Sequence, residues 1–172
     1  MDINVAVNGT MEELTAALEA MDPEVLAGGL LILAGIFAAM FALTVIRYLL
    51  TAIGYSKMYR KADIAPWKAF IPVYNSYNNY KLSWNGKMFF LAAALYILVN
   101  ALSGAEALAA QLAVAAAGIA LIVVTIKQNI KMAKLFGKGA GTGIALLFFP
   151  GITSLILGLG KAEFQAEMIE NN

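Results

Sequence analysis

Apolar residues gather in four long stretches of this chain, at 25–46, 86–102, 107–126 and 141–160. A helix rises about 1.5 Å per residue, so stretches of this length are suited to the roughly 30 Å of a bilayer's hydrocarbon core. Small residues recur along them, as is typical of helices that pack closely in a membrane. The pattern predicts an all-α integral membrane helical bundle of about four transmembrane helices, forming one domain over 25–160.

Two polar segments, 55–87 and 127–139, interrupt the apolar pattern and carry nearly all of the positive charge. Of the 12 Lys and Arg residues, every one except Lys161 lies in or beside these two segments. By the positive-inside rule, both segments are predicted to be cytoplasmic interfacial loops. The acidic lead-in 1–24 and the mostly acidic tail 161–172 are then both predicted to lie outside, on a multi-pass protein of a bacterial cytoplasmic (inner) membrane.

The acidic lead-in carries a helix signal of its own. Thr10 and Glu13 are spaced as a capping box, which predicts a short helix that ends near Met21. Pro23 is then suited to the first turn of the next helix. We interpret the lead-in as a solvated segment, with a helix that docks on a partner as the alternative.

Aromatic residues concentrate in the polar segment 55–87, at spacings of three and four. On a helix such positions share one face, and Trp and Tyr favour the headgroup level of a membrane. We therefore predict an amphipathic interfacial helix, with a ligand cage as the alternative. The predicted anchors are Trp67, Phe70, Tyr74, Tyr77, Tyr80 and Trp84.

Prolines predict where the helices bend. Pro66 and Pro72 should divide the interfacial segment into two short helical pieces, with Asn75 bonding backbone groups that the bend frees. Pro150 and Gly151 should kink the fourth apolar stretch, with the bend packed against protein. All five are predicted to be structural.

Seven basic side chains form two clusters on the predicted cytoplasmic face. Anionic lipid headgroups attract such clusters, and an acidic protein is the alternative partner. The predicted contacts are Lys57, Arg60, Lys61, Lys68, Lys131, Lys134 and Lys138.

The composition removes most routes to catalysis. The chain contains neither His nor Cys, so thiolate nucleophiles, histidine bases and the usual zinc ligands are excluded. The carboxylates Asp63 and Glu106 fall in different loops, too far apart to act as a pair. A net charge of +1 gives no field for nucleic acid. We predict no catalytic residue, no metal and no cofactor. Asn100 and Gln111 are interpreted as bonding across neighbouring helices.

Two stretches resemble a known family. The run from Lys61 to Asn75, and the run 133–138 followed by Phe149-Pro150 and 157–160, are similar to the signature of a bacterial family of small polytopic membrane proteins of unknown function. Its members often carry labels such as hypothetical or signal-peptidase-like membrane protein. Asp63 stands where the resemblance implies a glycine. No activity comes with the resemblance.

Two functions from different classes follow from these patterns. The first is a non-catalytic integral membrane subunit, a scaffold or accessory of a larger bacterial envelope or secretion assembly, whose partners are the bilayer and other membrane subunits or copies of itself. The second is a homo-oligomeric channel or small transport protein, since interrupted helices often line cavities.

Overall fold

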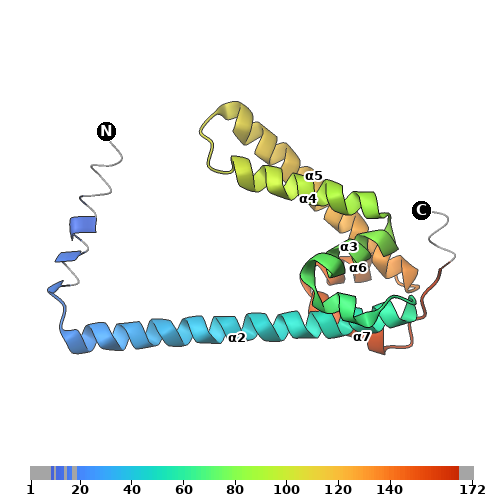
Figure 1. Cartoon of the computed structure of the whole chain (residues 1–172), viewed down its shortest axis with the longest axis horizontal. Coiled ribbons are helices and arrows are strands. Elements are labelled where there is room, and N and C mark those ends of the chain that lie inside the picture. Colours follow the sequence, from blue (N-terminus) through green and yellow to red (C-terminus); the bar gives the residue numbers. More distant parts are fainter. Residues whose placement is uncertain (1–8, 10, 14, 17–18, 167–172) are drawn as a thin grey trace. The chain divides into compact units, whose positions relative to one another are not determined.

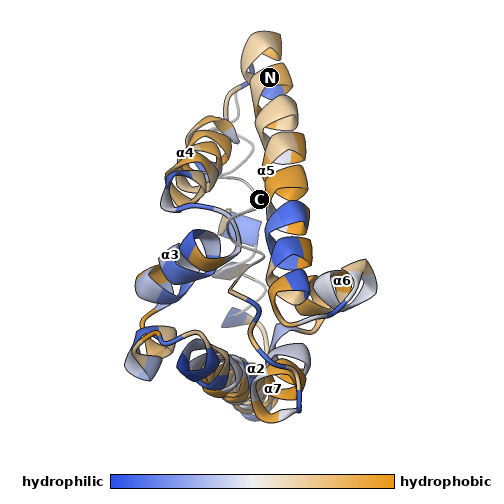
Figure 2. Ribbon diagram, turned by 90° about the vertical axis from the view of Figure 1, so that its right-hand side faces the viewer, coloured by the Kyte–Doolittle hydropathy of each residue, from blue (hydrophilic) through white to orange (hydrophobic). Residues whose placement is uncertain are grey.

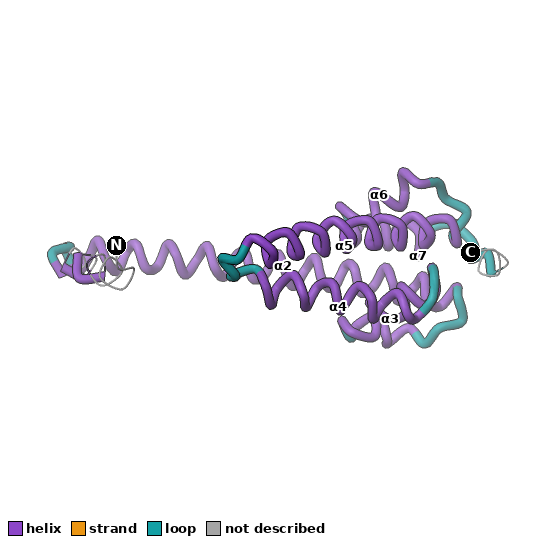
Figure 3. Tube along the Cα trace, turned by 90° about the horizontal axis from the view of Figure 1, so that it is seen from above, coloured by secondary structure: helices purple, strands orange, loops and turns teal. Residues whose placement is uncertain are grey.

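The computed structural model describes residues 9, 11–13, 15–16 and 19–166. Every regular element in that part of the chain is a helix, which confirms the all-α prediction (Figure 3). The chain divides into two compact units, 1–45 and 46–172, and each is described by itself. The predicted cap residue Thr10 lies outside the described residues.

The long helix α2 (Pro23–Lys61) begins in the first unit and ends in the second. Asp22 caps it, because its carboxylate accepts a hydrogen bond from the Glu24 N–H at 2.9 Å, and Pro23 occupies the first turn as expected. In the first unit its apolar side chains are exposed, with Leu31 at 74% and Phe41 at 72%. By length and composition, α2 and α5 (Leu108–Leu135) could each cross a membrane.

The interfacial segment contains two helices separated by an extended residue. The 3₁₀-helix η1 (Pro66–Phe70) is followed by α3 (Pro72–Ser83), and Ile71 between them has φ −106° and ψ 114°. The residue before a proline is biased toward this conformation, as the sequence predicted. The second piece is a helix of 12 residues.

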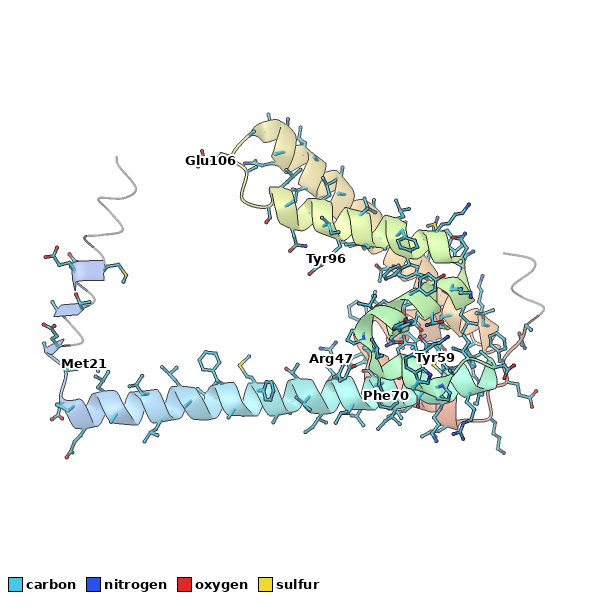
Figure 4. The ribbon with its side chains drawn as sticks, in the orientation of Figure 1. Met21, Arg47, Tyr59, Phe70, Tyr96 and Glu106 are labelled. Atoms are coloured by element: carbon cyan, nitrogen blue, oxygen red, sulfur yellow. The ribbon has the colours of Figure 1, made fainter. Side chains whose placement is uncertain are left out.

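Helices α4 (Gly86–Leu102) and α5 are consecutive and pack against each other. Asn85 caps α4 by accepting a hydrogen bond from the Met88 N–H at 3.1 Å. Glu106 lies in the loop that joins the two helices (Figure 4). The interpretation that Asn100 and Gln111 bond across the pair is wrong, because each donates to a nearby carbonyl in sequence, those of Tyr96 and Glu106.

The fourth apolar stretch is two short helices, α6 (Ala140–Phe148) and α7 (Pro150–Leu159). At about 1.5 Å per residue they measure roughly 13 and 15 Å, each about half of a bilayer core. The break falls at Phe149, as Pro150 predicted. Gly151 is buried and faces α2, whereas Phe149 is 63% exposed, so the bend is packed against protein on one side only.

Helix α7 runs parallel to α2, so the chain returns to the end from which α6 began. Gly151 faces the Arg47–Thr51 turn of α2, and Gly158 faces Gly54, Lys57 and Met58. The N–H of Gln165 then donates to the carbonyl of Leu135, at the end of α5, over 2.8 Å. The stretch predicted as one span, 141–160, is therefore two helices, and residue 165 of the tail lies beside the end of α5.

The core of the second unit lies where the ends of α2 and α5 meet α3, α6 and α7 (Figure 1). Its fully buried side chains come from each of these helices, and buried amides and hydroxyls lie among the apolar ones. In Figure 2 the start of α5 is coloured hydrophobic, whereas its last turns and much of α3 are hydrophilic. The largest buried apolar side chains are Met58, Tyr59, Met132, Leu135, Phe136, Leu146 and Leu157.

Candidate functional site

A chain of polar side chains joins three helices inside the second unit. The Tyr59 hydroxyl of α2 lies 2.7 Å from Asn75 Oδ1 and 2.8 Å from Asn79 Oδ1, both on α3. One turn further along α3, Ser83 donates to the Asn79 carbonyl at 2.6 Å and lies 3.4 Å from Gln128 Nε2 of α5. These groups hold α2, α3 and α5 together through hydrogen bonds in the interior of the unit.

Tyr59 is the centre of this polar cluster. Its side chain is fully buried, and its hydroxyl also lies 2.8 Å from the Asn75 backbone carbonyl. A phenol carries one hydrogen, so it donates to one of these three oxygens at a time. Figure 4 places Tyr59 among the dense side chains at the end of α2. Asn75 thus accepts from a tyrosine of α2, a contact that the sequence did not predict, and its predicted bonding of backbone groups freed by the bend stays a prediction.

Lys61 holds the C-terminal segment, residues 160–166, in place. Its ammonium donates to the carbonyls of Leu157, Gly160 and Ala162, each at 2.8 Å. An ammonium has three hydrogens, so this side chain is fully engaged at the end of α7, where a cation also complements the helix dipole. The structure therefore gives Lys61 a role inside the protein that the sequence did not predict.

The turn after α2 has the left-handed conformation that glycine favours. Asp63 has φ +56°, the Ile64 N–H donates to the Tyr59 carbonyl at 2.8 Å, and the Asp63 N–H donates to the Arg60 carbonyl at 3.4 Å. This is a Schellman motif. It explains why the resemblance implies a glycine where this chain has Asp63. A second motif of this kind ends α5 at Gly137, with φ +66°.

The six predicted aromatic anchors fall into three groups. Trp67 and Tyr74 pack edge to face at 5.6 Å and are both about half exposed. Tyr77 and Tyr80 instead pack on Phe89 of α4. Phe70 is exposed, and its backbone carbonyl accepts a hydrogen bond from the Tyr48 hydroxyl. The ring of Trp84 lies against the ammonium of Lys131, on α5. The single stripe that the spacing predicted is thus divided between Tyr74 and Tyr77, and Trp67 pairs with Tyr74 across the extended Ile71.

The other six predicted basic contacts differ in how far they are exposed. Arg60, Lys134 and Lys138 are exposed, and Lys57 and Lys68 are half-buried. Lys131 Nζ lies 4.6 Å from the centroid of the Trp84 ring, a cation–π distance. Partial burial, helped by the like charges of Lys134 and Lys127, lowers the pKa of the Lys131 ammonium.

The sequence reasoning missed two features. Tyr59 was not singled out, although a polar aromatic residue near the end of an apolar helix with asparagines nearby in sequence is a usable signal. The close approach of Gly54 to α7 was also missed, because one glycine in a helix does not identify its neighbour. The predicted bends Pro66, Pro72, Pro150 and Gly151 all lie at element boundaries or in first turns.

A family model matches residues 67–167, from η1 to the C-terminal segment, and its description is "Family of unknown function (DUF5684)". The match covers most of the second unit. No curated protein and no solved structure matches the chain.

Proposed function

The chain belongs to this family of unknown function, DUF5684. We propose that it is a non-catalytic integral membrane subunit, a scaffold of a larger bacterial envelope assembly. One observation carries the proposal. From Leu30 to Ile46, the large apolar side chains of α2 are exposed, several of them by more than 60%. Water does not tolerate a continuous apolar surface of this kind, whereas lipid and partner helices do.

Small residues on this part of α2 support a partner helix. Among the described residues, and apart from the adjoining backbone of α2 itself, no atom lies within 4 Å of a Cβ built on Gly28 or Gly35. The two glycines are two helical turns apart on one face. Small residues at such spacing let helix backbones approach closely in a membrane. The hydrogen-bonded polar cluster around Tyr59 would then lie toward the cytoplasmic surface.

For the topology we propose three spanning helices, α2, α4 and α5, and a re-entrant pair, α6 and α7. The support is the return of α7 to the end of α2 together with the short length of both helices. The amino-terminal end is then outside, and the carboxyl-terminal end is cytoplasmic.

Cysteine labelling tests this topology on a clean background, because the natural chain has no Cys. Single cysteines replace Glu163, Lys138 and Gly104 in turn, and an impermeant maleimide is applied to intact cells and to inverted membranes. We expect Glu163→Cys and Lys138→Cys to react from the cytoplasmic side and Gly104→Cys from the other. Labelling of Glu163→Cys together with Gly104→Cys would refute the re-entrant pair.

The scaffold role is tested by purifying the tagged full chain in mild detergent. We expect a partner to co-purify at fixed stoichiometry, to be lost in the G28I/G35I variant, and to be retained in the control L31I, which alters an exposed apolar position by shape only. A monomer without a partner would contradict the proposal.

A homo-oligomeric channel or small transport protein is the second candidate. It is favoured by the break between α6 and α7, since broken helices at membrane depth often line cavities. A ring-shaped homo-oligomer that conducts ions in a planar bilayer would support this function and would count against the scaffold.

A further inference from the structure

A cavity of about 460 Å³ lies at the end of α2 and is built from four parts of the chain. The turn after α2 contributes Asp63 and Ile64, η1 contributes Lys68, α3 contributes Lys81, and the C-terminal segment contributes Phe164. A volume of this size is typical of small-ligand sites. All of these residues belong to the second unit.

The lining combines positive charge with apolar walls. Two ammonium groups, of Lys68 and Lys81, oppose one carboxylate, of Asp63, so the cavity has an excess of positive charge. Lys68 and Lys81 come from different helices that are separated by the extended Ile71. The side chains of Ile64, Leu82 and Phe164 supply the apolar surface. Such a lining suits a molecule with an anionic head and an apolar part.

We propose that this cavity binds the phosphate group of an anionic amphiphile, with the phosphate between Lys68 and Lys81. The glycerol and first methylene groups lie along Ile64 and Phe164. A phospholipid headgroup and a soluble phosphate share this chemistry. The lipid source rests on the membrane location in the proposed function, whereas recognition of the phosphate does not depend on it.

Ligand binding is coupled to the position of the C-terminal segment. Phe164 forms one wall of the cavity, and its ring packs on Phe136 at 5.7 Å between centroids. The neighbouring Gln165 is held by the Leu135 carbonyl, and Lys61 holds Ala162. A ligand that contacts Phe164 therefore stabilises the docked segment, and the docked segment raises the affinity for the ligand by the same factor.

The test uses the purified full chain in a non-ionic detergent. Short-chain phosphatidylglycerol, short-chain phosphatidylcholine and inorganic phosphate are titrated separately, and affinity is measured from intrinsic fluorescence and from the shift in thermal midpoint. We expect phosphatidylglycerol to bind and K68Q/K81Q to weaken its binding roughly ten- to thirtyfold. The matched control K127Q/K138Q removes the same charge outside the cavity and should change affinity by less than about twofold.

Two further variants separate the site from general charge attraction and from misfolding. Asp63→Asn removes the opposing carboxylate, and asparagine tolerates the left-handed φ of this turn, so binding should tighten severalfold in a folded protein. Ala65→Trp fills the cavity without changing its charge and should abolish binding.

The possible results distinguish loss of the site, the source of the phosphate and loss of the scaffold role. Equal weakening in K68Q/K81Q and K127Q/K138Q, or unchanged binding in Ala65→Trp, would overturn the site. Competition by inorganic phosphate that depends on Lys68 and Lys81 supports a soluble phosphate source, whereas binding of phosphatidylglycerol without such competition supports a lipid. A chain that binds phosphatidylglycerol here but co-purifies with no partner would retain this site and lose the scaffold role.

Discussion

The contact between α2 and α7 leaves no room for a methyl group at Gly54. A Cβ built there would lie 2.1 Å from Ser154 Oγ and 2.7 Å from the backbone nitrogen of Leu155. The hydroxyl of Ser154 could rotate away, but the backbone of α7 could not. We therefore predict that Gly54→Ala displaces α7 and destabilises the second unit.

The expected magnitude follows from two opposing effects. Alanine favours a helix over glycine by about 1 kcal/mol, and overpacking a well-packed core costs about 1–3 kcal/mol. A clash with backbone belongs at the upper end of that range, so the net loss at Gly54 is about 1–2 kcal/mol. The control is Gly118 of α5, where no atom lies within 4 Å of a built Cβ. Gly118→Ala should keep the gain of up to about 1 kcal/mol from helix propensity.

The assay is thermal unfolding in one detergent at one scan rate, followed by tryptophan fluorescence. For a chain of this size a difference of about 1 kcal/mol shifts the midpoint by roughly 2–4 °C, so a difference of about 1–3 kcal/mol should separate the two variants by roughly 2–12 °C. Gly158→Ala meets the carbonyl of Gly54 at 2.6 Å and should act like Gly54→Ala. The double variant should lose less than the sum, since both changes act on one contact. A Gly54→Ala midpoint equal to or above that of Gly118→Ala would refute the reasoning.

Three other substitutions test the polar contacts and the turns by the same assay. Tyr59→Phe removes the hydroxyl at the centre of the polar cluster and should cost about 1–3 kcal/mol, whereas Tyr96→Phe at an exposed position should be neutral. Lys61→Met leaves three carbonyls of the C-terminal segment without their donor and should make that segment more susceptible to protease, with an unchanged cleavage rate as the contrary result. Gly137→Ala places a Cβ at φ +66°, 3.2 Å from Gln165, and should cost about 1 kcal/mol; a stability equal to the parent would contradict the turn assignment.

The sequence predicted well where the helices lie along the chain, but it predicted poorly which helices pack against each other. Apolar length, Pro23, the extended residues before Pro66 and Pro72, and Gly137 are local signals, because each acts on its own backbone. The course of α7 is set by a contact between Gly54 and Gly158, which are far apart in sequence. No local pattern identifies such a pair.

The candidate site was predicted in part for the same reason. A count of lysines found Lys68, but it could not separate Lys61, whose three hydrogens are used inside the protein. The spacing of aromatic residues could not show that Tyr77 and Tyr80 pack on Phe89 of α4, because that contact joins two different helices. The cavity needs Phe164, which reaches it only because the C-terminal segment returns to the end of α5.

The course of α7 also bears on Lys161, the one basic residue that departed from the predicted distribution of positive charge. With a tail outside, Lys161 was the single basic residue on the wrong face. In the structure it directly precedes Ala162, whose carbonyl accepts from Lys61, so both lysines lie at the same end of the second unit. A three-span topology with a re-entrant pair then places every lysine of the chain on or near the cytoplasmic face. The proposed topology therefore satisfies the positive-inside rule once the α2–α7 contact has placed Lys161, and the charge argument depends on that contact.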